Sequence, residues 1–509
     1  MNIMNELFKI AKAIENPVLR EKCLEIFRDS TPEKLWMDKY HLTMAQTSFL
    51  AGNAMKQSVS EMFIRKNPFD GAYTVVAGLG PVLEWLADYG YSDENIAWLA
   101  QDTNADGSPT FAPEFLEWLR TQKLSLTIDA MPEGELVFPN EPIVRVSGPK
   151  WQVDRIEAAI LNGINASCLI ATKAARINQA CAGRGVMEFG LRRAQDMFGM
   201  RSTRSAAVGG VLMTSNADAA KKYKLKWVGT HAHSFVMEHD TELSAFEEWL
   251  KHNPNNATVL VDTYDTIDGV KKAIQASKNT GVPLKGIRLD SGDLAKLSLA
   301  ARMLLDSADA NLQDCKICAS NDLDEYALEN LYSNGARIDI PAVGTKLVTG
   351  GEQSSLGGVY KLKCIDSKPK MKISGDAIKQ TIPGATETIR MLGTNGVFDG
   401  DVITSVGFVA HDSGELEFPI VSVDLATQRA KTFPAGTKFY KPAVRVVTDG
   451  VVDMAHAKRD IHDIASETNR NLYKLDSRHK RLQDAHRYVV GLEKSLFMKR
   501  LEMGWGYER

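Results

Sequence analysis

The sequence predicts an α/β fold: an irregular (β/α) barrel of about seven strands, with an N-terminal α+β domain before it and a strand-rich C-terminal region packed on it. Apolar runs of strand length recur seven times between Gly185 and about Thr349. Six of the seven are followed by a polar or glycine-containing turn and a helical pattern, and their starts lie about 20 to 30 residues apart, which is typical of βα units. The predicted strands are 186–189, 207–213, 225–228, 258–261, 284–289, 315–319 and 338–343.

The segments on either side of the barrel have their own patterns. We expect residues 1–36 to form one or two amphipathic helices, broken near Pro17. Strand-like runs then mix with short helices, expected at 82–89 and 112–123, before a long helical pattern begins at Trp151. The predicted divisions are a helical arm (1–36), an α+β domain with its connecting helix (37–184), the barrel with the active site (185–360) and a C-terminal strand-rich segment with a terminal helix (361–509).

The composition excludes several classes of protein. With 44% hydrophobic and 25% charged residues, the chain has an ordinary globular composition, and its 509 residues suit two or three domains. The formal net charge is -3, so the chain has no excess of positive charge of the kind that nucleic-acid-binding proteins carry. No apolar run approaches the roughly 20 residues that span a bilayer, and the start of the chain is too polar for a secretory signal. We therefore expect a cytoplasmic protein with no nucleic-acid or membrane partner.

The six cysteines are scattered along the chain, which favours reduced, buried thiols over a disulfide framework. Cys315 and Cys318 form a CxxC pair, but no second pair or adjacent histidine completes a zinc site. Both lie in an apolar strand pattern, so we interpret them as core residues rather than as a metal or redox site.

Residues 285–294 (KGIRLDSGDL) place charge where a predicted strand ends. Arg288 lies inside the apolar run, where a fixed positive charge is costly unless an anion faces it. That anion is either a protein carboxylate, as in an internal pair of Arg288 with Asp290, or a ligand. Asp290 or Ser291 could also simply cap the following helix. Both interpretations stay open on this stretch alone.

Similar polar segments follow the other predicted strands. They are residues 188–193, 214–216, 229–234, 262–266, 288–293, 320–322 and 344–346. Helix capping could explain Ser215, Ser320 and Thr345, but it does not explain arginines and two nearby histidines on the same rim. Because active sites of such barrels collect at the carboxyl ends of the strands, we expect a ligand site there. Positive charge and helix N-termini suit a phosphate-bearing ligand, and the acids suit ribose hydroxyls or a divalent cation.

Several motifs occur in a fixed order along the chain. They are DKY at 38–40, FIRKNPFDGAYTVVAGL, EFGLRRAQ, GTHAHSF, VLVDTYDT, IRLDSGDL, ICASNDLDE, VGTKLVTG and LGGVYKL. Together they closely resemble nicotinate phosphoribosyltransferases, over roughly residues 36 to 490. The resemblance implies a homodimer that joins nicotinate to 5-phosphoribosyl 1-pyrophosphate, releasing pyrophosphate and forming nicotinate mononucleotide for NAD synthesis. It also implies Mg²⁺ as a cofactor and ATP as a co-substrate, hydrolysed through a phosphorylated histidine.

The resemblance assigns roles to individual residues. His233 would be the phosphoryl acceptor, since a neutral imidazole is a competent nucleophile. Tyr40 and Phe189 would stack on the pyridine ring, with Tyr40 reaching into the partner subunit's site. Thr230 and Arg288 would hold the nicotinate carboxylate, which matches the planar fork of arginine.

The same matching predicts how the phosphoribosyl group is held. Asp262, Asp265 and Asp290 would surround the ribose, with Asp262 and Asp290 as Mg²⁺ ligands, and Gly344 and Thr345 would cradle the 5-phosphate. The remaining expected substrate contacts are Arg192, Asn321, Asp322 and Lys361.

Three other functions remain open from the sequence. The nearest is a nicotinamide phosphoribosyltransferase. Such enzymes usually carry an aspartate at the amide-binding position, whereas Thr214, Ser215 and Asn216 occupy that stretch here and favour an acid substrate. A non-catalytic sensor of NAD metabolites is disfavoured because it need not keep the phosphoryl acceptor His233. A barrel lyase with Lys346 as Schiff base is the third alternative.

Overall fold

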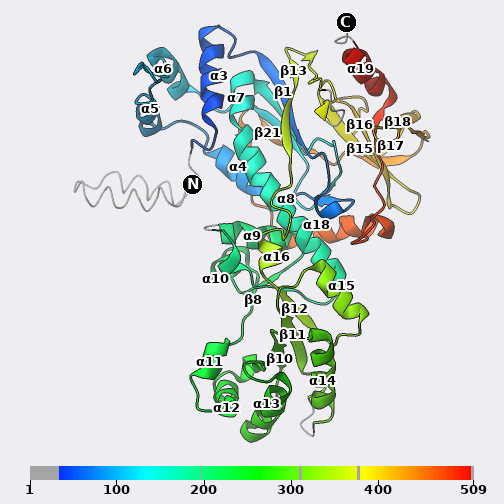
Figure 1. Ribbon diagram of the computed structural model, residues 1–509. Coiled ribbons are helices and arrows are strands. Elements are labelled where there is room, and N and C mark those ends of the chain that lie inside the picture. Colours follow the sequence, from blue (N-terminus) through cyan, green and yellow to red (C-terminus); the bar gives the residue numbers. More distant parts are fainter. Residues whose placement is uncertain (1–33, 196–197, 309–311, 375–378, 506–509) are drawn as a thin grey trace.

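The computed structural model describes residues 34–195, 198–308, 312–374 and 379–505. It contains three seven-stranded sheets and a two-stranded one, with the long helix α8 (Glu157–Ala180) running between them (Figure 1). Nearly all of the helical arm predicted for residues 1–36 lies outside the described residues.

The first sheet is the predicted barrel, and all of its strands are parallel. Its order is β8-β7-β6-β12-β11-β10-β9, so β8 and β9, which follow each other in the sequence, form the two open edges. The sheet is therefore a half-barrel. Its strands are β6 (Met187–Glu188), β7 (Met213–Thr214), β8 (Lys226–Trp227), β9 (Thr258–Leu260), β10 (Gly286–Leu289), β11 (Lys316–Ser320) and β12 (Ile340–Val343).

One predicted strand is wrong in its position. The run 207–213 begins inside helix α9 (Phe198–Val208), and the strand starts only at Met213. Ala207 is fully buried because the end of α9 packs closely on α8. The closeness is clear at the neighbouring Gly209, where a Cβ would lie 2.2 Å from the Ala171 carbonyl oxygen of α8. A short apolar run cannot distinguish a buried helix end from a strand by periodicity alone.

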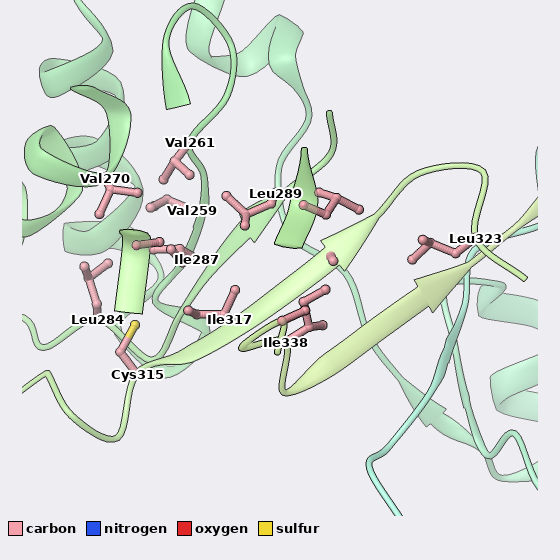
Figure 2. Packing of buried hydrophobic residues seen from close by; sticks show 14 of the residues in the cluster. Val259, Val261, Val270, Leu284, Ile287, Leu289, Cys315, Ile317, Leu323 and Ile338 are labelled. Atoms are coloured by element: carbon pink, nitrogen blue, oxygen red, sulfur yellow. The ribbon is translucent and has the colours of Figure 1, made fainter. Parts of the chain in front are cut away.

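A large apolar core fills the space between the parallel strands and the helices that cover them. Val259, Ile287, Leu289 and Ile317 point into it from β9, β10 and β11 (Figure 2). β-branched residues suit such strands because both faces are buried. The covering helices are α10 (Ala217–Tyr223), α11 (His233–Met237), α12 (Glu242–His252), α13 (Thr266–Thr280), α14 (Leu294–Asp306), α15 (Glu325–Ser333) and α16 (Thr345–Val348).

The second sheet is antiparallel and combines distant parts of the chain in the order β14-β13-β1-β5-β3-β21-β22. Its strands are β1 (Gln57–Phe63), β3 (Thr127–Ala130), β5 (Val144–Pro149), β13 (Val359–Ile365), β14 (Lys368–Pro369), β21 (Val444–Thr448) and β22 (Val451–Val452). The predicted domain boundary at 360/361 thus falls inside β13. Helices α4 (Leu79–Ala87) and α7 (Lys150–Arg155) contact this sheet, and α3 (Lys39–Leu50) packs on α7 and on the pair α5 (Asp93–Leu99) and α6 (Pro113–Thr121). Strand β2 (Thr74–Val75) pairs with β4 (Leu136–Val137).

The third sheet is mixed and C-terminal, in the order β17-β20-β15-β16-β23-β18-β19. Its strands are β15 (Thr386–Leu392), β16 (Phe398–Ser405), β17 (Ser413–Glu415), β18 (Ile420–Asp424), β19 (Ala430–Phe433), β20 (Lys438–Tyr440) and β23 (Val490–Glu493), and the last helices are α17 (Met454–Ala457), α18 (Ile461–Lys474) and α19 (Lys494–Trp505). The fully buried Arg390 joins this sheet to the N-terminal region, because its guanidinium lies 2.7 Å from both Asp401 and Glu135.

Helices α7 and α8 form one long apolar stretch. Of the described residues, only Lys150–Ala180 is long and apolar enough to cross a membrane, and 72% of its most apolar window is buried inside the protein. It is a core helix. Lys173 and Arg176 on α8 also bind the buried Glu325 of α15, at 2.7 and 2.9 Å, which fixes α8 against the half-barrel.

Candidate active site

Arg288 lies near the carboxyl end of β10, which is next to the edge strand β9 in the parallel sheet. Its Nη1 donates to the Thr230 hydroxyl at 2.9 Å and to the His231 carbonyl at 3.4 Å, and its Nη2 lies 3.8 Å from an Asp290 oxygen. Burial lowers the pKa of Arg288, an effect that the charges of Asp290 and Asp262 oppose. Its Nε is buried and has no hydrogen-bond partner among the described residues. The internal pair with Asp290 thus exists, but it leaves part of the guanidinium free for another anion.

Asp262 and Asp290 come from adjacent strands and meet beside Arg288. One Asp262 oxygen, Oδ2, accepts from the Asp290 N–H at 2.8 Å and from the Ser291 hydroxyl at 2.6 Å, and the Ser320 hydroxyl donates to Asp290. The other Asp262 oxygen, Oδ1, is buried without a hydrogen-bond partner in the described structure.

This orphaned oxygen fits Mg²⁺, which binds to one or two carboxylates and completes its shell with water and substrate phosphates. The described residues contain no group of three or more His, Cys, Asp or Glu side chains that could hold a metal ion by themselves. A cation here would therefore depend on ligands brought by the substrate.

His233 is the first residue of α11 and faces Asp290. Its Nδ1 lies 3.1 Å from the Thr263 hydroxyl, its Nε2 lies 3.7 Å from an Asp290 oxygen, and 41% of its side chain is exposed. His231, two residues earlier, is buried and has no such access to solvent. Only the second histidine of the pair is therefore placed to react with a ligand at the rim.

The inner face of the half-barrel next to the rim is apolar. Phe189 lies there with Met187, Met213, Cys318 and Ile340, and its N–H donates to the Val343 carbonyl at 2.9 Å. This face offers a planar ring an apolar surface within reach of Arg288. Arg192 lies in the exposed 3₁₀ turn Leu191–Arg193, close enough for its charge to lower the pKa of Arg288.

Glu188 is a residue whose role the sequence analysis missed. Its fully buried carboxylate accepts from the Gly190 N–H, from Thr203 at 3.1 Å and from Thr214 at 2.6 Å. It thereby fixes the turn after Phe189 to the neighbouring strand. The one sequence feature that could have indicated this role is the position of Glu188, an acidic residue at the end of an apolar run.

Gly344 and Thr345 lie at the start of α16, directly after β12. A Cβ on Gly344 would lie 3.1 Å from the Phe189 carbonyl oxygen, so glycine allows this turn to approach β6 closely. The turn therefore brings the backbone N–H groups at the start of α16 to the rim, where they could meet an anion.

Asp265, Asn321 and Asp322 follow β9 and β11 but are exposed. Asp265 caps α13 by accepting from the Asp268 N–H at 2.8 Å, and Asn321 accepts from the Asp322 N–H at 2.8 Å. The structure gives each a local role in addition to its place on the rim.

Tyr40 and Lys361 lie away from the rim of their own chain. Figure 1 shows α3 and β13 together in the upper part of the molecule and β10, β11 and β12 in the lower part. Both side chains are near Glu157, whose charge raises the pKa of Tyr40, after the larger effect of burial, and opposes the lowering of the Lys361 pKa by burial. Arg65 lies close to Lys361 and was not predicted; its buried Nε is unpartnered within the described residues.

Comparisons with known proteins agree with the motifs. The N-terminal domain model of nicotinate phosphoribosyltransferases matches residues 35–165, and the nicotinate phosphoribosyltransferase family model matches residues 185–394. The nicotinate phosphoribosyltransferase of Bacillus subtilis (strain 168) is 36% identical over 479 residues, which cover 92% of this chain and 94% of that protein. The chain belongs to the nicotinate phosphoribosyltransferase family.

Other nicotinate phosphoribosyltransferases support this membership. The protein of that name from Dictyostelium discoideum is 35% identical over 412 residues, covering 71% of this chain and 69% of that protein. The crystal structure of human nicotinic acid phosphoribosyltransferase matches with a TM-score of 0.78 and 25% identity, covering 92% of this chain and 99% of that one. A nicotinate-nucleotide pyrophosphorylase from Pyrococcus furiosus shares the fold, with a TM-score of 0.63 and 19% identity over 86% of this chain and 94% of that one. The predicted family, fold class and enzyme class are confirmed.

Proposed function

We propose that this chain transfers the 5-phosphoribosyl group of 5-phosphoribosyl 1-pyrophosphate to nicotinate, releasing pyrophosphate and forming nicotinate mononucleotide in NAD salvage. The observation that carries the proposal is the pair of Arg288 and Thr230, 2.9 Å apart beside the apolar inner face, in a chain of this family. The free part of the Arg288 guanidinium and the Thr230 hydroxyl can hold the nicotinate carboxylate while Phe189 stacks on the ring.

The reaction at C1 of the ribose needs no protein nucleophile. As pyrophosphate departs, the ribose develops positive charge next to the carboxylates of Asp262 and Asp290, which stabilise it electrostatically. Asp262 and Asp290 would hold Mg²⁺, which supplies charge neutralisation for the departing pyrophosphate when bound. Gly344 and Thr345 would hold the 5-phosphate with backbone N–H and hydroxyl donors.

ATP coupling is assigned to His233, because its ring is partly exposed and faces Asp290 at the rim. Phosphorylation of the ring would place negative charge beside the phosphoribosyl site and could shift the equilibrium between open and closed forms.

The position of Tyr40 supports an active site shared between two copies. Its side chain is 46% exposed on a surface that also carries Lys361 and Arg65, away from the rim of its own chain. In a homodimer, Tyr40 of one copy would stack on the pyridine ring bound by the other, and Lys361 would contact a phosphate there. We place this dimer in the cytoplasm, where the buried free thiols, including Cys168 and Cys318, would stay reduced.

Nicotinamide is the alternative substrate. The Thr214 hydroxyl donates to Glu188, the Ser215 hydroxyl donates to the Glu188 carbonyl at 3.4 Å, and Asn216 caps α10, so none of these three residues offers a carboxylate that could bind an amide. The deciding experiment measures mononucleotide and pyrophosphate formation with nicotinate or nicotinamide, each with and without ATP and Mg²⁺. ATP-stimulated turnover of nicotinate is expected. Turnover of nicotinamide alone would refute the assignment of nicotinate as the substrate. Turnover of neither compound would favour a non-catalytic sensor.

A further inference from the structure

The loop that carries His233 passes the open edge of the parallel sheet. On its paired side, β9 binds β10, and the N–H of Val261 just after β9 donates to the Arg288 carbonyl at 3.2 Å. The preceding N–H, on Leu260, points to the opposite side, where the sheet has no further strand in the described part of the chain. Leu260 is fully buried, so an unpaired N–H at this position would be costly.

His231 pairs with this N–H. Its Nε2 accepts from the Leu260 N–H at 3.1 Å, and its Nδ1 lies 3.3 Å from the Ala232 carbonyl oxygen. An accepting nitrogen carries no proton, so the neutral tautomer protonated on Nδ1 satisfies both contacts. The ring is 5% exposed, with the centroids of Phe235 and Trp249 at 5.3 and 5.0 Å. Burial lowers the pKa of His231 to about 4, which keeps it neutral at neutral pH.

The backbone of His231 is tied to the proposed nicotinate site. Its carbonyl accepts from Arg288 at 3.4 Å and from the Thr230 hydroxyl at 3.3 Å. Two residues later, the His233 ring contacts Thr263, which follows β9. The side chains of His231 and His233 therefore hold the loop to β9 and the residues just after it. The Thr230 hydroxyl and the His231 carbonyl hold it to Arg288 of β10.

We propose that His231 is a positioning residue: by capping the free edge of β9, it fixes the loop that presents Thr230 to nicotinate and His233 to ATP. The inference rests on the proposed function and extends it, because it gives the two histidines of GTHAHSF different tasks. His231 contacts no substrate; it acts through the geometry of Thr230, Arg288 and His233. Loss of its acceptor would misplace reacting groups, to which phosphoryl transfer and carboxylate binding are both sensitive.

The chain offers a matched control in His239. Its ring also has two polar partners, the Phe235 carbonyl at 2.7 Å and Glu248 at 3.1 Å, and it packs on the same Phe235 ring at 4.8 Å. Neither partner belongs to β9, β10 or the rim. His239→Leu therefore removes an imidazole that packs on the same ring, without touching the proposed anchor.

The test compares wild type, His231→Leu, His231→Gln and His239→Leu. It measures the melting temperature, the rate of protein labelling by radiolabelled ATP, and kcat and KM for nicotinate. His231→Leu should lower the labelling rate and raise the nicotinate KM by about tenfold or more, whereas His239→Leu should change both by about twofold or less. His231→Gln should recover part of the loss because its amide oxygen can accept from the Leu260 N–H. Equal behaviour of the two leucine variants, or no recovery with glutamine, would overturn the proposal.

A second measurement observes the His231 ring in the wild-type protein and uses a variant only to assign its signal. Nitrogen NMR of wild-type histidines at neutral pH should show a neutral ring with Nε2 unprotonated and Nδ1 protonated that is absent in His231→Gln and is thereby assigned to His231. The opposite tautomer would overturn the proposal. If wild type neither labels nor turns over nicotinate, the proposed function fails, while the NMR result still decides whether His231 caps β9.

Discussion

The Nε2 atom of His233 lies 3.7 Å from a carboxylate oxygen of Asp290, whose other oxygen accepts from Ser320 and whose N–H binds Asp262. The proposed phosphoryl acceptor and the proposed ribose site thus share one residue. A phosphoryl group on His233 would introduce negative charge next to Asp290, so the two sites cannot be electrostatically independent.

Replacement of His233 by alanine should abolish labelling of the protein by ATP, because the only imidazole open to the rim among the described residues is lost. Turnover of nicotinate should then become insensitive to ATP. Incorporation is measured on the intact protein under conditions that retain phosphohistidine. His239→Ala is the control and should label normally; label retained in His233→Ala would refute the assignment.

Replacement of Asp262 by asparagine should raise the Mg²⁺ concentration needed for half-maximal pyrophosphate release by about tenfold or more. The amide keeps one oxygen to accept from the Asp290 N–H and puts an NH₂ group, which cannot bind a cation, at the orphaned position. A Mg²⁺ titration at saturating substrates checks this. An unchanged titration curve would show that the cation binds elsewhere.

Replacement of Arg288 by lysine should raise the nicotinate KM about 10- to 100-fold, since lysine cannot form a bidentate pair with a carboxylate. Thr230→Val should have a smaller effect in the same direction, because it removes one donor and leaves the Arg288 guanidinium in place, still bound to the His231 carbonyl. Initial rates over a range of nicotinate concentrations separate KM from kcat. A change in kcat alone would place nicotinate away from this pair.

Subunit mixing tests the proposed shared site. Tyr40→Ala and His233→Ala should each be impaired as homodimers, but a refolded equimolar mixture should recover about a quarter of wild-type activity, because half of the dimers are mixed and each has one intact site. Activity that never exceeds the average of the two variants would show that Tyr40 acts within its own chain.

Glu141 predicts a pH dependence of stability. It is fully buried near Asp401, and burial, with the Asp401 charge adding to it, raises the pKa of Glu141 well above its ordinary value. The native state therefore keeps a proton that the unfolded state loses above about pH 4.5, so this residue's contribution to stability falls as the pH rises from there.

Glu141→Gln mimics the neutral acid and should gain stability relative to wild type as the pH increases from about 4.5 to 7. Urea unfolding at several pH values measures the difference. The exposed Glu417 is the control residue, and Glu417→Gln should show no such trend. A constant difference between Glu141→Gln and wild type would mean that Glu141 is ionised in the folded protein.

The position of the rim could be predicted from sequence because parallel strands end at one edge. Thr230 and Arg288 are far apart in the chain, yet each follows or ends an apolar run, and the structure joins them by a hydrogen bond. The same reasoning placed Asp262 beside Asp290. Roles in catalysis do not follow from this, since Asp265 occupies an equivalent position and caps a helix.

Other features depend on tertiary packing that no local pattern encodes. Ala207 belongs to a helix because α8 covers it, and Glu188 is buried only because Thr203 and Thr214 converge on it. The contact of His231 with the Leu260 N–H exists because the half-barrel stays open between β8 and β9. Periodicity predicts strands but does not predict where a sheet ends.

The antiparallel sheet around β1 has a consequence for the synthesis of the chain. Its central strands β1, β5 and β3 end by residue 149, but their outer neighbours β13 and β21 begin only at residues 359 and 444. While the ribosome makes the intervening residues, both sides of this three-stranded core carry unpaired N–H and C=O groups, which can template association with other nascent chains. This antiparallel sheet can be completed only when nearly the whole protein has been translated. A product truncated before residue 359 would keep two unpaired strand edges that favour aggregation.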